Sequence, residues 1–350
     1  MKTRAVIVLT LIIFISSMGP GTASSGDTAP EEPLAPPAPI TGLVIIDYDW
    51  SVTNIQRFLN ATIYLTGNLT VASTGNLEFV NTTLALNISR NGQYKIKVDG
   101  KFTMADLDMD PSTQADASLI KSNNTAFKYF FQAVAGSSVF LYNSILRNCG
   151  YDGQSQGMTL SGTAILDGML FQNNYFGLVA KSSNVMVLNS TFSGGYYGIY
   201  SYFCNPTLRN LTIIGSSVRG MYLYYSTPVL EDCVLLNNRV GLYLQNSEPR
   251  ALRCNITGSQ TAGISAWYSS PLLEDSWLSN IIDMEVRIGS FPRLLNTQFN
   301  ESRVSVDLGY YASVGQHLKV AVVNSTGAPQ PDITVAVLDE IGRASCRERV

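Results

Sequence analysis

The sequence predicts an all-β protein folded as a parallel β-helix with about 21–22 residues per coil. Two independent markers share this period: prolines lie 22, 21, 22 and 21 residues apart, and glycines lie 21, 22, 21 and 22 residues apart. These are Pro206, Pro228, Pro249, Pro271 and Pro292, with Gly177, Gly198, Gly220, Gly241 and Gly263. A fixed period of this size indicates a repeat architecture.

Apolar and variable residues alternate after each glycine, as they do along a β-strand. No segment has a helical period of useful length. We expect one side of each strand to face the core, namely Leu178, Ala180, Ile199, Ser201, Met221, Leu223, Leu242, Leu244, Ile264 and Ala266. An apolar residue also recurs seven positions after each proline, and two earlier residues share its expected register: Ile213, Leu235, Ile256, Leu278 and Phe299, with Leu170 and Phe192.

The length of the repeat selects among the repeat folds. The leucine-rich frame is absent, and a propeller blade needs about twice the length. The remaining solution is a coil that closes after one repeat and stacks on the next, with parallel strands about 4.8 Å apart along the axis. A single coil cannot bury its apolar side chains, so the core forms only when successive coils stack on one another.

These residues resemble the right-handed parallel β-helix repeat family, which includes pectin-lyase-like and NosD-like solenoids. The resemblance rests on the Gly-[Ile/Leu/Met]-x-[Leu/Ala]-x-x-Ser strands and on the turns at Asn173-Asn174 and Asn237-Asn238. It extends from about Gly136 to Leu308. The resemblance implies an enzymatic alternative, because pectate lyases and polygalacturonases share this fold, but a shared fold alone does not fix the function.

The rest of the chain divides by composition. We predict a signal peptide at 1–23, a Pro-rich linker at 24–42 and an N-terminal cap with irregular first coils at 43–135, before the regular coils at 136–308. Residues 316–339 resemble the start of a truncated immunoglobulin-like or carboxypeptidase-regulatory-like domain. Residues 340–350, "EIGRASCRERV", resemble a translated sequencing adapter, and we expect an artefact there and a natural chain that continues past Asp339.

Several function classes are disfavoured by the composition. The net charge is −3 and only 14% of residues are charged, so no basic field attracts nucleic acid. The single histidine, His317, lies outside the repeats, which disfavours serine–histidine and cysteine–histidine catalysis and histidine metal sites. We therefore predict no cofactor and no metal, with calcium expected only if the chain is a lyase.

Aromatic residues recur at outward-facing positions of the repeats and predict a binding surface. The predicted ligand-binding residues are Tyr200, Tyr202, Tyr222, Tyr224, Tyr243, Trp267 and Tyr268. Rings with polar tips on a repeating scaffold suit a polysaccharide or a cell-surface glycan. The alternative is that stacked tyrosines only stabilise parallel strands or pack under a neighbouring domain.

A polar column four residues after the prolines, together with the residues just before it, contains the catalytic candidates. They are Glu231, Asp232, Arg253, Glu274 and Asp275. Under the lyase or hydrolase alternative, clustered acids and an arginine would carry the reaction, but neither signature motif of those enzymes is present. Because Arg253 separates the two aspartates, we favour a neutralised structural ladder.

Export is predicted by the signal peptide and by ten Asn-x-Ser/Thr sequons. They begin at Asn60, Asn68, Asn81, Asn87, Asn123, Asn189, Asn210, Asn255, Asn300 and Asn324. We expect a secreted or cell-surface glycoprotein with a non-catalytic scaffold, adhesion or glycan-binding role. The alternative is a polysaccharide lyase or glycoside hydrolase. Cys233 and Cys254 are expected to be buried thiols on adjacent coils, and the pairing of Cys149 and Cys204 stays open.

Overall fold

The computed structural model describes residues 37–108, 110, 115–153, 156–182, 184–316, 334–338 and 344–349. The predicted signal peptide, most of the predicted linker, His317 and Asn324 lie outside these residues. No helix in the described part of the chain is long and apolar enough to cross a membrane.

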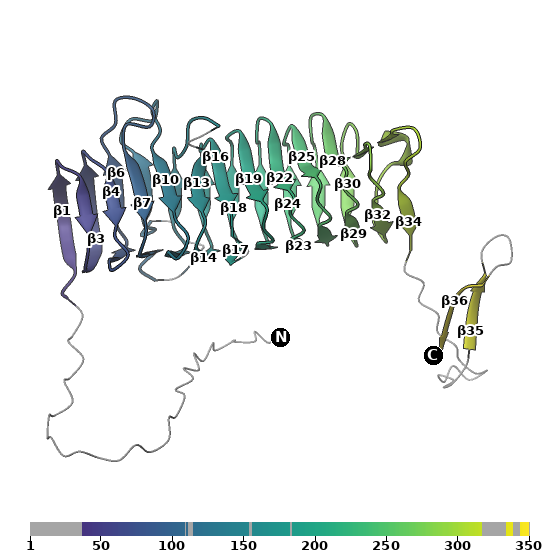
Figure 1. Cartoon of the computed structure of the whole chain (residues 1–350), viewed down its shortest axis with the longest axis horizontal. Coiled ribbons are helices and arrows are strands. Elements are labelled where there is room, and N and C mark those ends of the chain that lie inside the picture. Colours follow the sequence, from purple (N-terminus) through teal and green to yellow (C-terminus); the bar gives the residue numbers. More distant parts are fainter. Residues whose placement is uncertain are drawn as a thin grey trace, which may run out of the picture. The chain divides into compact units, whose positions relative to one another are not determined.

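Residues from Ile40 to Gly315 form a β-solenoid in which each strand pairs in parallel with the equivalent strand of the next coil (Figure 1). The predicted all-β repeat fold is therefore confirmed. The first strand begins at Ile40, so its first three residues fall in the segment that we predict as linker. Three columns of strands run along the solenoid.

The first column is a 12-stranded parallel sheet. Its strands are β2 (Trp50–Val52), β4 (Leu69–Val71), β7 (Lys95–Val98), β10 (Phe130–Ala133), β13 (Gly157–Leu160), β16 (Phe176–Ala180), β19 (Tyr197–Tyr202), β22 (Arg219–Tyr224), β25 (Val240–Gln245), β28 (Ala262–Trp267), β31 (Met284–Val286) and β33 (Val304–Val306).

The second and third columns are joined by the long strand β3 (Ile55–Leu65), which takes part in both. The other strands of the second column are β5 (Asn76–Val80), β8 (Lys101–Ala105), β11 (Ser138–Tyr142), β14 (Thr163–Asp167), β17 (Val185–Leu188), β20 (Thr207–Arg209), β23 (Val229–Glu231), β26 (Arg250–Leu252), β29 (Leu272–Glu274), β32 (Arg293–Leu295) and β34 (Ser313–Gly315). Those of the third are β1 (Ile40–Ile46), β6 (Thr83–Leu86), β9 (Leu119–Ser122), β12 (Ile145–Arg147), β15 (Leu170–Gln172), β18 (Thr191–Ser193), β21 (Thr212–Ile214), β24 (Val234–Leu236), β27 (Asn255–Thr257) and β30 (Trp277–Ser279).

Two further elements complete the described structure. The 3-10 helix η1 (Glu301–Arg303) precedes β33. The strand β35 (Thr334–Leu338) pairs antiparallel with β36 (Ala344–Arg349), which lies in the segment that we predict as an artefact.

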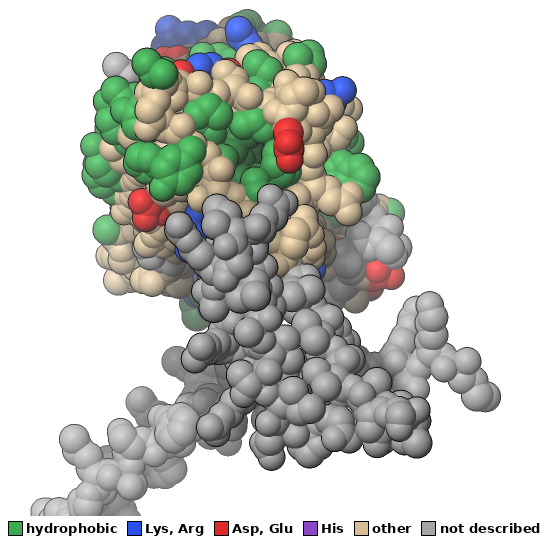
Figure 2. Space-filling model, turned by 90° about the vertical axis from the view of Figure 1, so that its right-hand side faces the viewer, with side chains coloured by type: hydrophobic (Ala, Val, Ile, Leu, Met, Phe, Trp, Pro, Cys, Tyr) green, Lys and Arg blue, Asp and Glu red, His purple; other side chains and the backbone are tan. Residues whose placement is uncertain are grey.

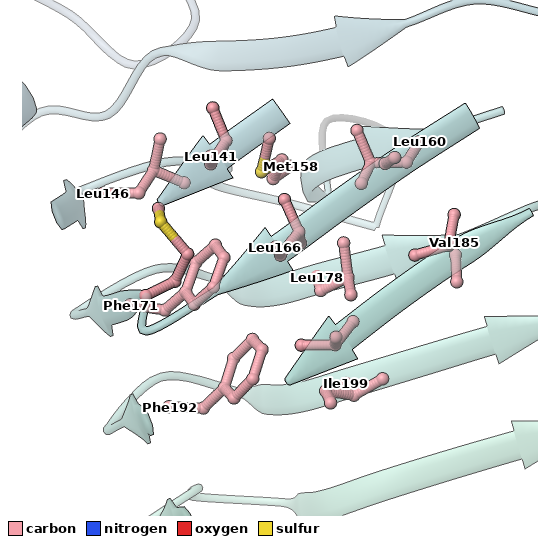
Figure 3. Close-up of a cluster of buried hydrophobic side chains, with 14 of the residues drawn as sticks. Leu141, Leu146, Met158, Leu160, Leu166, Phe171, Leu178, Val185, Phe192 and Ile199 are labelled. Carbon is pink, nitrogen blue, oxygen red and sulfur yellow. The ribbon is translucent and has the colours of Figure 1, made fainter. Parts of the chain in front are cut away.

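The core consists of rows of apolar side chains from successive coils (Figure 3). All ten residues predicted to face the core after the glycines are buried, as are Ile213, Leu235, Ile256 and Leu278. Phe171 and Phe192 stack in the interior with centroids 4.4 Å apart and planes 1° apart. The prediction for Leu170 is wrong: the coil there has 21 residues, so Phe171 pairs with Phe192 and Leu170 faces outward.

Buried asparagines satisfy backbone groups at the turns between coils. The Oδ1 of Asn238 accepts from the backbone N–H of Ser216 and its Nδ2 donates to the backbone carbonyl of Ile213, both at 2.9 Å. Asn174 and Asn280 make the equivalent pairs of bonds. Because buried polar groups must be paired, these asparagines fix the spacing of adjacent coils.

Candidate functional site

The predicted ligand-binding residues lie on the outer side of the first column, on β19, β22, β25, β28 and the turn after each strand. Parallel register places Tyr200, Tyr222 and Tyr243 side by side on successive coils. It also aligns Tyr202 with Tyr224, which is followed in the same row by Gln245 and then Trp267. We call this surface the aromatic face.

Several of the rings stack face to face on rings of the next coil. Tyr200 and Tyr222 lie 4.8 Å apart with planes 18° apart, and Tyr202 and Tyr224 lie 5.5 Å apart with planes 8° apart. In the turns, Phe203 and Tyr225 stack at 4.7 Å and 5°. The stacked rings cover one another's faces, and the guanidinium of Arg219 lies over the ring of Tyr222, so the ring edges are the parts most open to solvent.

The polar interruption, Gln245 and Asn246, divides the aromatic face. Gln245 separates Tyr224 from Trp267 along one row. Asn246 occupies the turn between those of Tyr225 and Tyr268, and all three have the left-handed backbone with φ between 47° and 50°. Two coils span roughly 9.6 Å at 4.8 Å each. Two carboxamides thus lie between aromatic rings on either side.

Arg219 is a member of the aromatic face that the sequence analysis missed. Its guanidinium lies 3.7 Å from the ring centroid of Tyr243 and 4.3 Å from that of Tyr222, and its Nη1 donates to the Tyr197 hydroxyl at 3.0 Å. Cation–π contacts of this kind rigidify the rings that they join. The signal was present: Arg219 precedes Gly220 just as Tyr197 precedes Gly198.

Partial burial raises the pKa of two of the tyrosines. Burial raises the pKa of Tyr222 to about 12, with the nearby Arg219 partly opposing the shift. Burial, reinforced by the neighbouring Tyr222, raises the pKa of Tyr200 well above its usual value. Both phenols are therefore neutral and can act as hydrogen-bond donors over the whole physiological range.

The five catalytic candidates lie elsewhere, on the second column and in the turns that follow it. Arg253 donates to the carboxylates of both Asp232 and Glu231, at 2.7 and 2.6 Å. Arg209 contacts Glu231 at 2.6 Å, and Arg250 pairs with Glu274. The structure brings Glu231, Asp232 and Arg253 together, but on a different sheet from the aromatic face.

Asp275 continues the same column and accepts from Asn296. Hydrogen bonding to Arg253 lowers the pKa of Asp232. A general acid needs a raised pKa, so this carboxylate is tuned away from that role. Asp232, Arg253 and Asp275 also have the left-handed backbone, with φ between 49° and 55°. Among residues other than glycine, asparagine and aspartate tolerate this conformation best, so the turn geometry explains why polar residues recur in this column.

One acidic cluster escaped the sequence analysis. Asp106, Asp108 and Asp116 follow β8, and one carboxylate oxygen of each lies within 4.8 Å of the others. Asp106 is buried and pairs with Asn143, and burial raises its pKa. The Asp-x-Asp spacing of 106 and 108 was the available signal. These are oxygen ligands of the kind that calcium prefers, but nothing else at the cluster points to a ligand.

Most described sequons have their amides engaged. The Nδ2 atoms of six donate to neighbouring coils at 2.7–3.1 Å: Asn68, Asn81, Asn87, Asn123, Asn189 and Asn210. Asn60, Asn255 and Asn300 are exposed, and within the described residues their Nδ2 atoms donate to no partner. Cys149, Cys204, Cys233 and Cys254 are buried and form no disulfide in the part of the chain that the structure describes.

Comparison with known proteins supports the fold. Residues 131–278 match the family model of the right-handed β-helix region, which confirms the predicted resemblance over this part of the chain. No curated protein matches the chain. Among solved structures, the periplasmic alginate epimerase AlgG is 11% identical, with 75% of this chain and 78% of that chain covered and a TM-score of 0.37. The TibC-catalysed hyper-glycosylated fragment of TibA is 13% identical, with 79% and 100% covered and a TM-score of 0.29. Both are too distant to bear on function.

Proposed function

We propose that this chain is an exported, non-catalytic β-helix protein that binds a glycan through its aromatic face. The observation that carries the proposal is the exposure of five aromatic side chains on one side of the solenoid. Tyr202, Phe203 and Tyr225 are 39%, 57% and 47% exposed, and Trp267 and Tyr268 are 36% and 53% exposed. Concentrated exposed apolar surface is typical of a binding site.

The chemistry of the surface favours a sugar over an apolar ligand. Aromatic rings offer a flat apolar surface with polar tips, which matches the alternating C–H and hydroxyl surfaces of a sugar ring. At the polar interruption, the Oε1 of Gln245 accepts from the Tyr222 hydroxyl at 2.6 Å, and the carboxamide Nε2 of Gln245 and the carboxamide of Asn246 add polar groups between the aromatic rows. A mostly aromatic surface with a few fixed polar groups is the usual composition of a ligand site.

Rigidity supports the same function. The stacks, the Arg219 contacts and the parallel strands hold the rings in place before any ligand arrives. A preorganised surface loses little side-chain entropy on binding. A repeating row of sites also suits a repeating polymer, because successive units can bind together.

The polar column supports a non-catalytic role. Its carboxylates are held by Arg209, Arg250 and Arg253, and Asp232 has a lowered pKa. Glycoside hydrolysis requires one carboxyl group with a raised pKa beside a second carboxylate, both facing the substrate. The column lies on a different sheet from the aromatic face, so the two do not form one site.

The test is binding to a panel of insoluble and soluble polysaccharides with single-ring variants. We expect Tyr225→Ala and Tyr268→Ala each to weaken binding roughly two- to tenfold, since one aromatic contact contributes about 0.5–1.5 kcal/mol. Trp277→Ala is the matched control, because Trp277 is 52% exposed on the third column. Failure to bind any polymer, or equal losses for Trp277→Ala and Tyr225→Ala, would reject the proposal.

A further inference from the structure

The first strand of the solenoid has an open edge. One edge of β1 pairs in parallel with β3, with Val44 opposite Ile63 and Ile45 opposite Tyr64. No described strand pairs with its other edge. An open edge presents a row of unpaired backbone N–H and C=O groups, which are a template for another strand.

The sequence of β1 has few of the features that block such pairing. Its seven residues, "ITGLVII", contain no charge and no proline. Leu43 is 66% exposed, Ile45 is 64% exposed and Ile40 is 44% exposed. Natural edge strands are usually blunted by lysine, proline, a bulge or a cover. Only the bulge at Gly42 is present, and it leaves Leu43–Ile46 regular.

The chain before β1 cannot supply the missing strand. Residues 24–39 contain five prolines, at 30, 33, 36, 37 and 39. Proline has no backbone donor and is excluded from paired strand interiors. The nearest segment of the same chain is therefore unsuited to completing the sheet, which favours a strand from another molecule.

We propose that β1 pairs with β1 of a second copy of this chain. Antiparallel pairing about a two-fold axis is the arrangement in which one strand edge pairs with an identical edge. Centring the axis on Val44 places Leu43 opposite the partner's Ile45 on the outer surface of the joined sheet. This pairing continues the third column across the interface and sets the two most exposed side chains of β1 against their counterparts on the partner.

The other end of the solenoid provides the contrast. Figure 2 views the molecule from the side of β34 and shows hydrophobic side chains on that end. Leu308 is fully exposed there, and Val314 is 53% exposed. The strands at that end, β33 and β34, are also free of charge and pair on one edge only among the described strands, but each has three residues whereas β1 has seven. Short edge strands offer few backbone groups for pairing, so the length of β1 distinguishes the two ends.

The test is the oligomeric state of the full-length chain, measured by light scattering from about 1 to 100 µM. We expect a dimer for the wild type and a dissociation constant at least about tenfold higher for Leu43→Lys/Ile45→Lys, because each introduced lysine then lies directly opposite a lysine of the partner copy and like charges at opposed positions destabilise a sheet. Leu308→Lys should stay dimeric. Circular dichroism checks that each variant folds; should the double variant not fold, Leu43→Lys alone serves.

A second variant tests the geometry directly. Directly opposed residues of an antiparallel pair have Cα atoms about 4.5–5.5 Å apart, within disulfide range. Val44→Cys should therefore form a covalent dimer on mild oxidation, whereas Val229→Cys, exposed on β23, should not. A wild type that is monomeric throughout, a dimer that survives in the lysine variant, or a dimer lost in Leu308→Lys would overturn the proposal.

Discussion

Replacing Asn238 with leucine tests whether the buried asparagines hold the coils together. Asn238 is fully buried and is the partner of two backbone groups, the N–H of Ser216 and the carbonyl of Ile213. Leucine has nearly the same shape but no polar atom, so it fills the site, keeps water out and leaves both groups unpaired. The change isolates hydrogen bonding from packing.

The magnitude follows from the two orphaned groups. Each buried unpaired donor or acceptor costs about 1–3 kcal/mol, so Asn238→Leu should lower the free energy of unfolding by about 2–6 kcal/mol. With a denaturant slope of about 3 kcal/mol per molar urea, the unfolding midpoint should fall by about 0.7–2 M. Urea unfolding followed by circular dichroism measures the shift.

Asn255→Leu is the control, because Asn255 is exposed on β27 and should change the stability by no more than about 0.5 kcal/mol. The reasoning is refuted if Asn238→Leu unfolds at the wild-type midpoint. It is equally refuted if the two variants lose the same stability, since burial would then make no difference.

Three further predictions concern the site and the surface. Burial raises the pKa of Tyr222 to about 12, so the contribution of the neutral phenol to stability is complete below the ordinary tyrosine pKa of about 10 and is lost as the pH rises toward 12. Thermal unfolding of the wild type between these pH values should show the loss of stability, and the loss should be smaller in Tyr222→Phe. Because Arg253 lowers the pKa of Asp232, Arg253→Gln should raise the Asp232 pKa toward its usual value in a carboxyl titration by NMR. The wild type loses stability as the pH falls through the lowered pKa, and this loss should be smaller in the variant. An unchanged Asp232 pKa would show that Arg253 is not the cause of the shift. When the chain is expressed in a host that exports and N-glycosylates it, glycopeptide mass spectrometry should find a glycan on the exposed Asn255 and none on Asn81, whose Nδ2 donates to a neighbouring coil. A glycan on Asn81 and none on Asn255 would contradict the link between free side-chain amides and modification.

The repeat made much of the fold predictable. The spacing of the glycines gave the register that aligns Tyr200 with Tyr222, because parallel strands at fixed period place equivalent residues side by side. The alternation then gave the inward and outward faces. Leu170 failed because a marker offset by one residue moves a side chain to the other face of a strand.

The missed features depend on contacts between coils that no single repeat contains. Arg219 occupies the position that holds a ring in earlier coils, and its cation–π contact with Tyr243 joins two different coils. This contact cannot be read from either repeat alone. The left-handed backbone at Arg253 is set by the turn between the second and third columns, in which most other coils place asparagine or aspartate. The cluster around Asp106 arises in a coil whose length departs from the period.

The measurement that tests the central claim most directly is polymer size during binding. The full-length chain would be incubated with each polysaccharide, with and without calcium, and followed by size-exclusion chromatography with light scattering. The account predicts that protein co-elutes with polymer of unchanged length, and that Tyr225→Ala/Tyr268→Ala abolishes the co-elution. A polymer that becomes shorter in the presence of the protein would contradict it and would direct attention to Asp232 and Arg253.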